Sequence, residues 1–299
     1  AKFENWDSVL PDGVASASKQ GEKYIAAPIF ISTVNWRYAN LSLLKSVGVD
    51  EPMSWRAFMT SLPIIQKAGY IPLAVGGQDW QETLLFDHVA LGVGGAQYFR
   101  ELLDGNMNTI DSVYTTGVFA AMRALEPFTD AGKAGRNWGD TNNLVITGKA
   151  GYIFMGDWAK GGFLQANKIP GQDFSCQISP GSGMVLTAVD GFVFPKTSSG
   201  ADQATQVRLA SAMMNKDVQT KAALLKGALP ARTDASTEGF DHCSQNALSL
   251  LGSGSAALHW NVRDSGFKGV LKDVVSQFWN SDMSPEKARK MLVDGLKQL

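Results

Sequence analysis

The sequence has no excess of charge of either sign and no long apolar run. Its 299 residues include 27 Lys and Arg against 28 Asp and Glu, which leaves a formal net charge of −1. A protein that binds nucleic acid usually carries a basic excess on one face, and no basic run occurs here. The apolar stretches are short, as at residues 151–155, and none could span a bilayer. We therefore expect neither a nucleic-acid partner nor a membrane-spanning segment.

Signatures of common enzyme classes are also missing. The sequence contains no Gly-x-Ser-x-Gly turn, no Gly-x-x-x-x-Gly-Lys-Ser/Thr phosphate loop and no His-Glu-x-x-His motif. The glycine-rich stretch 92–95 follows a predicted helix and not a strand, so we expect a loop there. A glycosidase needs only two facing carboxylates, and Glu82, Asp157 and Asp190 keep that class open. Apart from this alternative the sequence favours binding over catalysis, and it predicts no cofactor.

Cysteine and histidine are scarce, with two and three residues. Cys176 and Cys243 suit two buried thiols in a reducing compartment or a disulfide in an oxidising one. A disulfide would close a loop long enough to contribute roughly 3–4 kcal/mol in the chain-entropy model. His242 directly precedes Cys243, which does not suit the ligand spacing of a zinc site. The spacing therefore predicts no metal site.

No signal peptide is recognisable in residues 1–19, because Asp7 and Asp12 interrupt that stretch. The sequence is then either that of a cytosolic protein or one that begins after its true start. With 44% hydrophobic residues it contains enough apolar material for one large domain or two lobes.

Apolar strands alternate with helices in the first half of the sequence, which is typical of the α/β class. Apolar runs predict strands at residues 24–30, 34–38, 71–75 and 152–155. Helical spacing predicts helices at residues 6–14, 41–47, 55–62, 84–91 and 116–129, one that ends at 144–146 and one that begins at Trp158. Ser54 is a favourable N-cap for the helix that follows it.

Beyond Pro180 the pattern becomes β-like and then helical. Residues 184–187 and 191–194 predict two strands, with Asp190-Gly191 as a turn or hinge between them. Helical regions follow at 201–225, divided near Asn215, and at 238–251. Ser284-Pro285-Glu286 begins the second of two terminal helices, with an N-cap and a proline in the first turn.

Tryptophan is abundant, with eight residues, and several lie next to amides or carboxylates. Three segments repeat this arrangement, at 78–81, 137–140 and 156–159. A sugar presents apolar C–H faces and a rim of hydroxyls, so its site needs aromatic plates with polar groups at their edges. A core tryptophan whose N–H finds a local acceptor would look similar. Three such segments in one chain favour a sugar site.

Short segments along the whole chain follow one recurring order. They are Lys23–Pro28 with Val34–Trp36, Asp50–Trp55 with Phe58, residues 76–81 and 148–151, Met155–Gly161, Cys176, residues 190–192 and 226–234, Cys243 and residues 278–286. This order resembles that of extracellular solute-binding proteins for carbohydrates. The segment Met155-Gly156-Asp157-Trp158-Ala159-Lys160-Gly161 is most similar to their glucose-binding branch.

The resemblance implies a two-lobed clamshell of the periplasmic-binding-protein type (type II). Such a protein captures one monosaccharide, in the first place glucose, in the periplasm. It then delivers the sugar, as a monomer, to the permease subunits of an ABC importer.

Matching positions imply the sugar contacts of this chain. They are Trp138, Trp158, Asp190, Lys226 and His259, with Trp80 and Gln78 at the edge of the cleft. Trp138 and Trp158 would be stacking plates, and Asp190 would bond to hydroxyls. Lys226 would be a donor, and His259 a further donor or acceptor. The residues after His259 are Trp260 and Asn261, where the family more often has small residues.

Family members begin with further strands and a helix that this chain does not contain. We therefore expect an incomplete amino-terminal lobe (residues 1–32 and 192–231) and a well-formed carboxy-terminal lobe (residues 33–191 and 232–299). The strand around Pro28 and residues 192–194 would then have unpaired sheet edges. Both cysteines fall in the second lobe, which makes a disulfide plausible. Sugar affinity should be greatly weakened, because an incomplete lobe loses contacts to the sugar and part of the free energy that favours closure of the two lobes.

Two further functions remain open at this point. A carbohydrate-active enzyme would use the cleft carboxylates and turn its sugar over. A sensor subunit would present the sugar to a receptor. The residues do not rank glucose against galactose or mannose, because hydroxyl orientation is distinguished by fine geometry.

Overall fold

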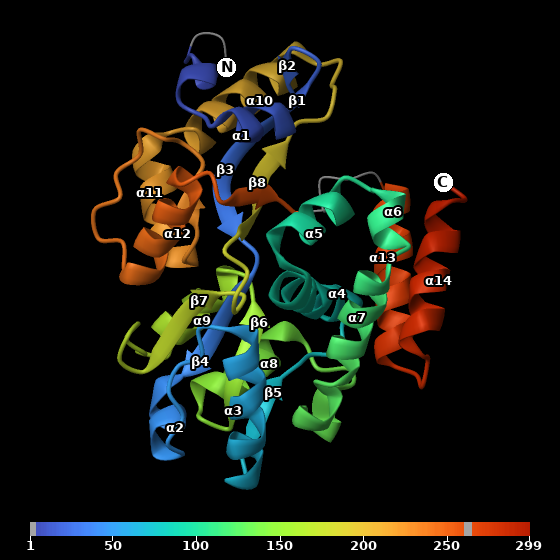
Figure 1. Cartoon of the computed structure of the whole chain (residues 1–299). Coiled ribbons are helices and arrows are strands. Elements are labelled where there is room, and N and C mark those ends of the chain that lie inside the picture. Colours follow the sequence, from blue (N-terminus) through green and yellow to red (C-terminus); the bar gives the residue numbers. More distant parts are fainter. Residues whose placement is uncertain (1–3, 260–264) are drawn as a thin grey trace.

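The computed structural model describes residues 4–259 and 265–299. Within these residues it contains two four-stranded mixed sheets, which we call the β3 sheet and the β4 sheet. The β3 sheet has the order β10-β8-β3-β9, and the β4 sheet has the order β5-β6-β4-β7. Figure 1 shows the β3 sheet above the β4 sheet. This arrangement confirms the predicted α/β class.

The β3 sheet is built on one long antiparallel pair, β3 (Ala26–Thr33) and β8 (Val185–Val193). Two short strands extend it, β9 (Leu229–Pro230) beside β3 and β10 (Ala256–Leu258) beside β8. A separate small hairpin, β1 (Lys19–Gln20) with β2 (Lys23–Tyr24), precedes β3.

Asp190 and Gly191 lie inside β8, so the predicted turn between two strands is wrong. Gly191 pairs with Pro28, at the point where the register of β3 shifts before Phe30. A Cβ atom on Gly191 would lie 2.7 Å from the carbonyl oxygen of Ala27. The glycine therefore permits a close approach of two backbones, and an Asp-Gly pair alone does not distinguish this from a hairpin turn.

The β4 sheet consists of β4 (Trp36–Asn40), β5 (Ile71–Ala74), β6 (Ala150–Met155) and β7 (Phe174–Ile178). Every residue of β4 and β6 is buried. A strand buried on both faces has a nearly continuous apolar sequence, which is why these strands could be predicted. β4 begins two residues after the predicted start, because residues 34 and 35 cross between the sheets.

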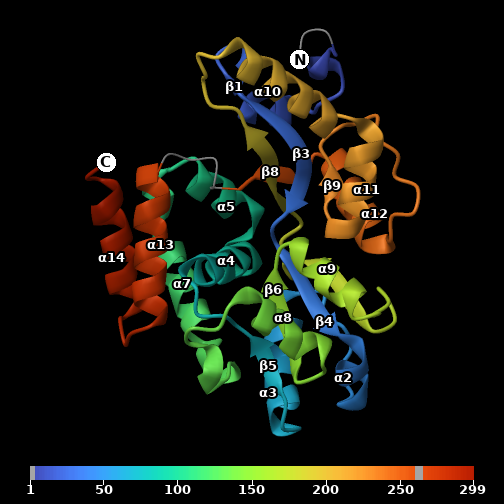
Figure 2. The same ribbon diagram turned by 180° about the vertical axis from the view of Figure 1, so that it is seen from behind.

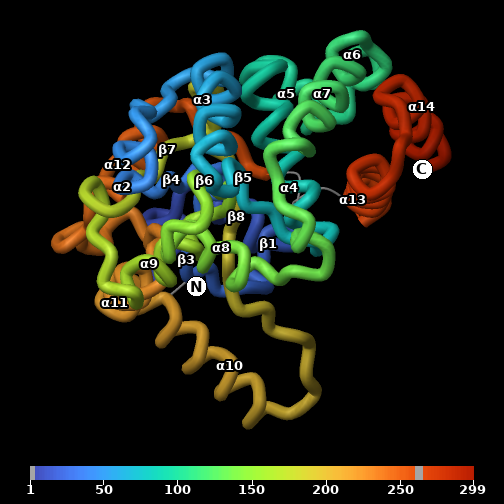
Figure 3. The backbone as a smooth tube through the Cα atoms, turned by 90° about the horizontal axis from the view of Figure 1, so that it is seen from below, coloured from blue at the N-terminus to red at the C-terminus, as the bar shows by residue number. Residues whose placement is uncertain are grey.

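The helices form three groups (Figures 1 and 2). Beside the β3 sheet lie α1 (Asp12–Ala17), α10 (Gly200–Met213), α11 (Lys216–Lys226) and α12 (His242–Gly252). Around the β4 sheet lie α2 (Leu41–Ser46), α3 (Trp55–Lys67), α8 (Trp138–Ile146) and α9 (Trp158–Gln165). The third group is a helical flank of α4 (Asp79–Val89), α5 (Gly95–Leu103), α6 (Met107–Ile110), α7 (Val113–Arg123), α13 (Ser265–Trp279) and α14 (Pro285–Leu296). Figure 3 shows α10 at the edge of the molecule, and none of its residues is fully buried, although Ala210 and Met213 pack against the core.

Three predicted helix starts are confirmed by side-chain caps. Ser54 Oγ accepts from the N–H of residue 57 at 3.2 Å, and Ser284 Oγ accepts from that of residue 287 at 3.3 Å. Asn215 Oδ1 accepts from the N–H groups of residues 217 and 218, which divides α10 from α11 as predicted. These caps occupy N–H groups that have no partner within their own helix.

The stretch 92–95 is not the predicted loop. Residues Ala90–Gly94 form a π-helical turn that joins α4 to α5. A Cβ atom on Gly92 would lie 2.4 Å from Cε3 of Trp55. The glycine is therefore required by the packing of an indole and not by a turn.

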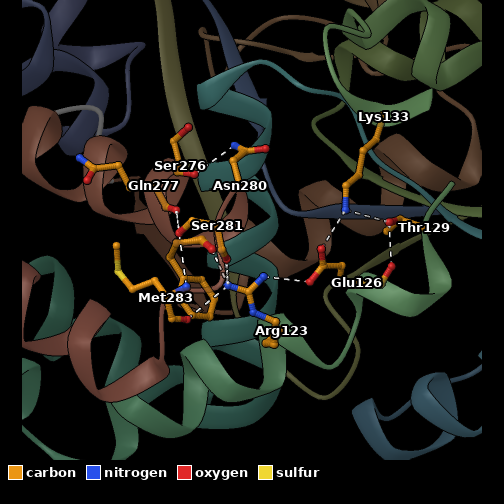
Figure 4. Close-up of polar contacts among 10 residues, drawn as sticks. Arg123, Glu126, Thr129, Lys133, Ser276, Gln277, Asn280, Ser281 and Met283 are labelled. Carbon is orange, nitrogen blue, oxygen red and sulfur yellow. Dashed lines mark hydrogen bonds and ion pairs between the residues drawn. The ribbon is translucent and has the colours of Figure 1, made fainter. Parts of the chain in front are cut away.

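Arg123 holds the end of α13 against the rest of the helical flank (Figure 4). Its Nη2 donates to the carbonyl oxygens of Phe278, Ser281 and Met283 at 2.5, 2.7 and 3.4 Å. Its Nη1 pairs with Glu126 at 2.8 Å. The guanidinium thus binds carbonyl groups in the last turn of α13 and in the loop that follows it, where a helix has few donors of its own.

Replacing Arg123 with Met is expected to lower the free energy of unfolding by about 2 kcal/mol, since hydrogen bonds to a charged donor are lost. Methionine keeps the aliphatic stem, so that packing changes little. Urea unfolding measures the effect. The control Arg100→Met removes an exposed arginine from α5, and it should change the free energy by less than about 0.5 kcal/mol. Equal effects of the two substitutions would contradict the assigned role.

The predicted lobe boundaries do not follow the sheets. Residues 185–191 and 256–258, which the prediction assigns to the carboxy-terminal lobe, pair with one another and with β3 in the β3 sheet. Among the described residues, β8 beyond residue 187 pairs only with β3, and Val193 at its end is 69% exposed. The division into lobes and the incompleteness of the first remain predictions. None of the described helices is long and apolar enough to cross a membrane.

Candidate functional site

Two segments of the chain cross between the sheets side by side. The N–H of Val34 donates to the carbonyl of Leu186 at 2.8 Å. Asn35, which is fully buried, donates to the carbonyl of Met184 at 3.0 Å and accepts from the N–H of Leu186 at 2.7 Å. These bonds fix the junction between the sheets.

Asp190 and Lys226, both predicted as sugar contacts, meet at this junction. Lys226 ends α11, and its Nζ forms an ion pair with Asp190 Oδ2 on β8. Ser32 on β3 joins them: its Oγ donates to Asp190 Oδ2 at 2.7 Å and accepts from Lys226 Nζ at 2.8 Å. The ammonium also lies 4.5 Å from the ring centre of Phe30. Both charged side chains remain partly exposed, so the cluster offers a donor and an acceptor to a ligand.

Asp157 is the buried carboxyl group of the same region. Its Oδ2 accepts from the N–H of Thr33 at 2.7 Å and from its hydroxyl at 3.2 Å. Its Oδ1 has no partner among the described residues. Burial raises the pKa of Asp157 from 3.8 to about 7, although the Thr33 bonds and the Lys226 charge act in the opposite direction. The sequence indicates Asp157 both as one of three candidate catalytic carboxylates and as the acidic neighbour of Trp158.

Trp158 follows Asp157 directly and begins α9. Its ring meets that of Trp80 on α4 edge to face, with centres 6.2 Å apart. Gly156 lies under the indole, because a Cβ atom there would be 2.1 Å from Cζ3 of Trp158. Two predicted tryptophans are therefore brought together, and both are partly exposed.

Gln78 and Trp138 lie on neighbouring segments. Gln78 is the residue before α4, and its Oε1 accepts from Gln81 Nε2 at 2.8 Å. The N–H of Gly77 donates to the carbonyl of Arg136 at 3.0 Å, which places the loop before α4 beside the loop before α8. Trp138 is the first residue of α8, and it is 37% exposed.

His259 is buried, in contrast to the other candidates. Its Nε2 lies 2.7 Å from Asp87 Oδ2 on α4, and its N–H donates to the carbonyl of Thr187 at 2.8 Å. The next residue of α4, His88, bonds to Ser179 Oγ at 2.8 Å. Burial, with smaller contributions from nearby positive groups, holds the pKa of His88 well below its usual value. Trp260 and Asn261, which the prediction also considered, lie outside the described residues.

The predicted disulfide is confirmed. It joins Cys176 on β7 to Cys243 on α12, with Cα atoms 5.8 Å apart. It therefore ties a helix that lies beside the β3 sheet to an edge strand of the β4 sheet (Figure 1).

Sequence reasoning missed the uncharged members of the junction, which are Ser32, Thr33 and Asn35. Small polar residues are common, and no motif distinguished these three. The only available signal was their position between the predicted strands 24–30 and 34–38 or at the start of the second.

Known proteins resemble the chain in sequence and in fold. The chain is 34% identical over 302 residues to a "Probable sugar-binding periplasmic protein" of Rhizobium meliloti (strain 1021), covering 98% of this chain and 72% of the relative. It is 24% identical over 284 residues to an "Uncharacterized ABC transporter extracellular-binding protein" of Pyrococcus horikoshii, covering 92% of this chain and 63% of the relative. The bacterial solute receptor AcbH shares the fold with a TM-score of 0.81 and 19% identity, over 99% of this chain and 78% of the receptor.

A family model gives the broader relationship. The model described as "Bacterial extracellular solute-binding protein" matches residues 2–207, which is well over half of the chain. The fold likeness to AcbH agrees with the predicted periplasmic-binding-protein-like architecture. The chain belongs to the bacterial extracellular solute-binding protein family.

Proposed function

We propose that the protein captures a monosaccharide at the junction between its sheets and delivers it, as a monomer, to an ABC importer. Its family consists of solute-binding proteins, so its activity is binding and not catalysis. The names of the relatives support a periplasmic sugar-binding role and an ABC transporter. AcbH is described as having an exclusive substrate preference for b-D-galactopyranose. Glucose is the first candidate for this chain, on the motif of residues 155–161.

The observation that carries the proposal is a charged cluster next to an aromatic pair. Asp157 connects the two, because it bonds to Thr33 beside Ser32 and directly precedes Trp158. A Cβ atom on Gly227 would lie 3.0 Å from the carbonyl oxygen of Asp157, which places the end of α11 against the same loop. The Lys226–Asp190 pair can bond to hydroxyls while an indole covers the apolar face of a sugar ring.

The remaining predicted contacts are part of the proposal. Trp138 and Gln78 border the same region through the paired loops before α8 and α4. The bond from His259 to Asp87 fixes the imidazole just after β10, and His259 stays among the proposed contacts because of the resemblance. The permease subunits are the partners that this function requires.

Replacing Asp190 with Asn is expected to weaken sugar binding about 10- to 100-fold, because a charge-assisted hydrogen bond contributes about 1.5–3 kcal/mol. The Lys226–Asp190 pair is partly exposed, so that stability should change little. Calorimetric titration with glucose, galactose and mannose measures the effect. The titration is carried out with this chain and with a longer version. The longer version adds the amino-terminal segment that the resemblance predicts to be missing.

Asp234→Asn is the matched control. It removes a carboxylate that is 44% exposed, against 45% for Asp190, and that pairs with Arg232 and not with Lys226. Sugar affinity should stay at the parent value. If Asp190→Asn binds sugar as tightly as this control does, the cluster is not the binding site.

A further inference from the structure

Three donor atoms converge where β7 meets α12. Cys176 and Cys243 form the disulfide, and the imidazole of His242 lies beside both sulfurs. Nε2 of His242 is 3.7 Å from Sγ of Cys176 and 3.9 Å from Sγ of Cys243. The three atoms all lie within 4.8 Å of one another. Sequence spacing does not show this group, because the fold brings Cys176 to the adjacent pair 242–243.

We propose that Cys176, Cys243 and His242 form a zinc site when the disulfide is reduced. Zinc bonds of about 2.3 Å to sulfur and about 2.0–2.1 Å to nitrogen, in tetrahedral geometry, place neighbouring ligand atoms about 3.5–3.8 Å apart. The two sulfur–nitrogen distances already lie close to that range. Only the two sulfurs have to separate, which rotation of the cysteine side chains allows while the Cα atoms stay 5.8 Å apart.

The surroundings hold the three residues without help from the disulfide. Asp241 Oδ1 caps α12 through the N–H of Ser244 at 3.0 Å. Lys160 of α9 binds both residues, with its Nζ 3.0 Å from Asp241 Oδ1 and 2.6 Å from Ser244 Oγ. On the other side Cys176 is paired with Tyr38 inside the β4 sheet. The ligands should therefore stay near their present positions after reduction.

The site is also open on one side. Both cysteines are buried, whereas His242 is exposed. A Cβ atom on Gly171 would lie 3.3 Å from Cε1 of His242, so the loop before β7 packs closely against the ring. A metal ion can enter past the imidazole, and water can fill the fourth position. Cys243 is the second residue of α12, where the helix N-terminus favours a thiolate.

The chemistry balances in two steps. A dithiol reductant gives two electrons and two protons to the sulfur–sulfur bond, which becomes two thiols while the reductant becomes a disulfide. Zn²⁺ then replaces both thiol protons, which go to solvent, and accepts the lone pair of His242 Nε2. The bound zinc ion therefore takes the place of the disulfide as the link between β7 and α12.

The test compares zinc binding to the oxidised and reduced protein. The protein is reduced with dithiothreitol, freed of it by anaerobic gel filtration, and titrated with Zn²⁺ against a chromophoric chelator. Co²⁺ serves as a second probe, because its spectrum reports thiolate ligands. We expect the reduced protein to bind one equivalent and the oxidised protein to bind none at the same concentration.

Variants separate this site from other binding. His242→Ala should weaken zinc binding by more than the roughly 10- to 100-fold that loss of an outer-shell partner costs. Ser249→Ala, on the exposed side of α12, should bind as the parent does. The double variant Cys176→Ser with Cys243→Ser should bind no zinc under either condition.

Several results would overturn the proposal. Equal binding by the oxidised and reduced forms would show an adventitious ion only. Unchanged affinity in His242→Ala would remove the imidazole from the site. Loss of the near-ultraviolet circular dichroism on reduction, without recovery on addition of zinc, would also overturn the proposal. It would show that the three residues do not stay in place once the disulfide is broken.

Discussion

Replacing Asp157 with Asn is expected to raise the free energy of unfolding by up to about 4 kcal/mol at pH 8, since each pKa unit corresponds to about 1.4 kcal/mol. Burial raises the pKa of this carboxyl from 3.8 to about 7. The folded protein therefore holds the proton more tightly than the unfolded chain. Below about pH 3 the group is mostly protonated in both states, and the substitution should have little effect.

The pH dependence follows from the same shift. As the pH rises from about 4 to about 7, the unfolded chain ionises at Asp157 while the folded protein does not, so the folded state loses stability relative to the unfolded chain. Well above pH 7 the group is ionised in both states, and the difference becomes constant. Asparagine keeps an oxygen for the two bonds from Thr33 and carries no charge. The difference in stability between variant and parent should therefore grow across this window.

Urea unfolding of both proteins between pH 4 and pH 9 measures this difference. Asp104→Asn is the control, because it removes an exposed carboxylate at the end of α5. Its effect should stay within about 0.5 kcal/mol at every pH. A difference between Asp157→Asn and parent that does not grow between pH 4 and pH 7 would show that Asp157 is not a buried proton-binding group.

Removing the disulfide by Cys176→Ser with Cys243→Ser should lower the free energy of unfolding by about 4 kcal/mol in the chain-entropy model for a separation of 67 residues. Without the bond, α12 is held to the β4 sheet through Lys160 and through packing. The parent in its reduced, zinc-free form should unfold at nearly the same urea concentration as the variant.

The same urea experiment under oxidising conditions provides the comparison. Ser249→Ala should leave the unfolding midpoint unchanged. A loss below about 1 kcal/mol in the double variant would contradict a stabilising role, because removal of a native disulfide usually costs about 2–5 kcal/mol.

Local signals in the sequence predicted local structure well. Ser54, Asn215 and Ser284 cap helices because each cap depends on residues two or three positions away. Glycines led to wrong predictions where they are needed for contacts between segments that are distant in the sequence. Gly191 and Gly92 suggested a turn and a loop, but each makes room for a group that is distant in the sequence: the backbone around Pro28 and the ring of Trp55.

The candidate site could be predicted only in part, for the same reason. Ser32 bonds to Asp190 across 158 positions and to Lys226 across 194 positions, so no spacing rule joins them. The resemblance to a family supplied Asp190 and Lys226, but it gave no partner for either. Asp157 was indicated as a candidate catalytic carboxylate and as the neighbour of Trp158, but not as a buried group. Its burial and its raised pKa depend on the way the crossing segment at Thr33 closes over it.

The most direct test of a sugar-binding function is calorimetric titration with a panel of monosaccharides. It uses this chain and the longer version with the amino-terminal segment whose absence the resemblance predicts. We expect the longer version to bind one equivalent of a monosaccharide, glucose before galactose and mannose, and this chain to bind it much more weakly. If the longer version gives no heat of binding with any sugar of the panel, the proposed function is wrong.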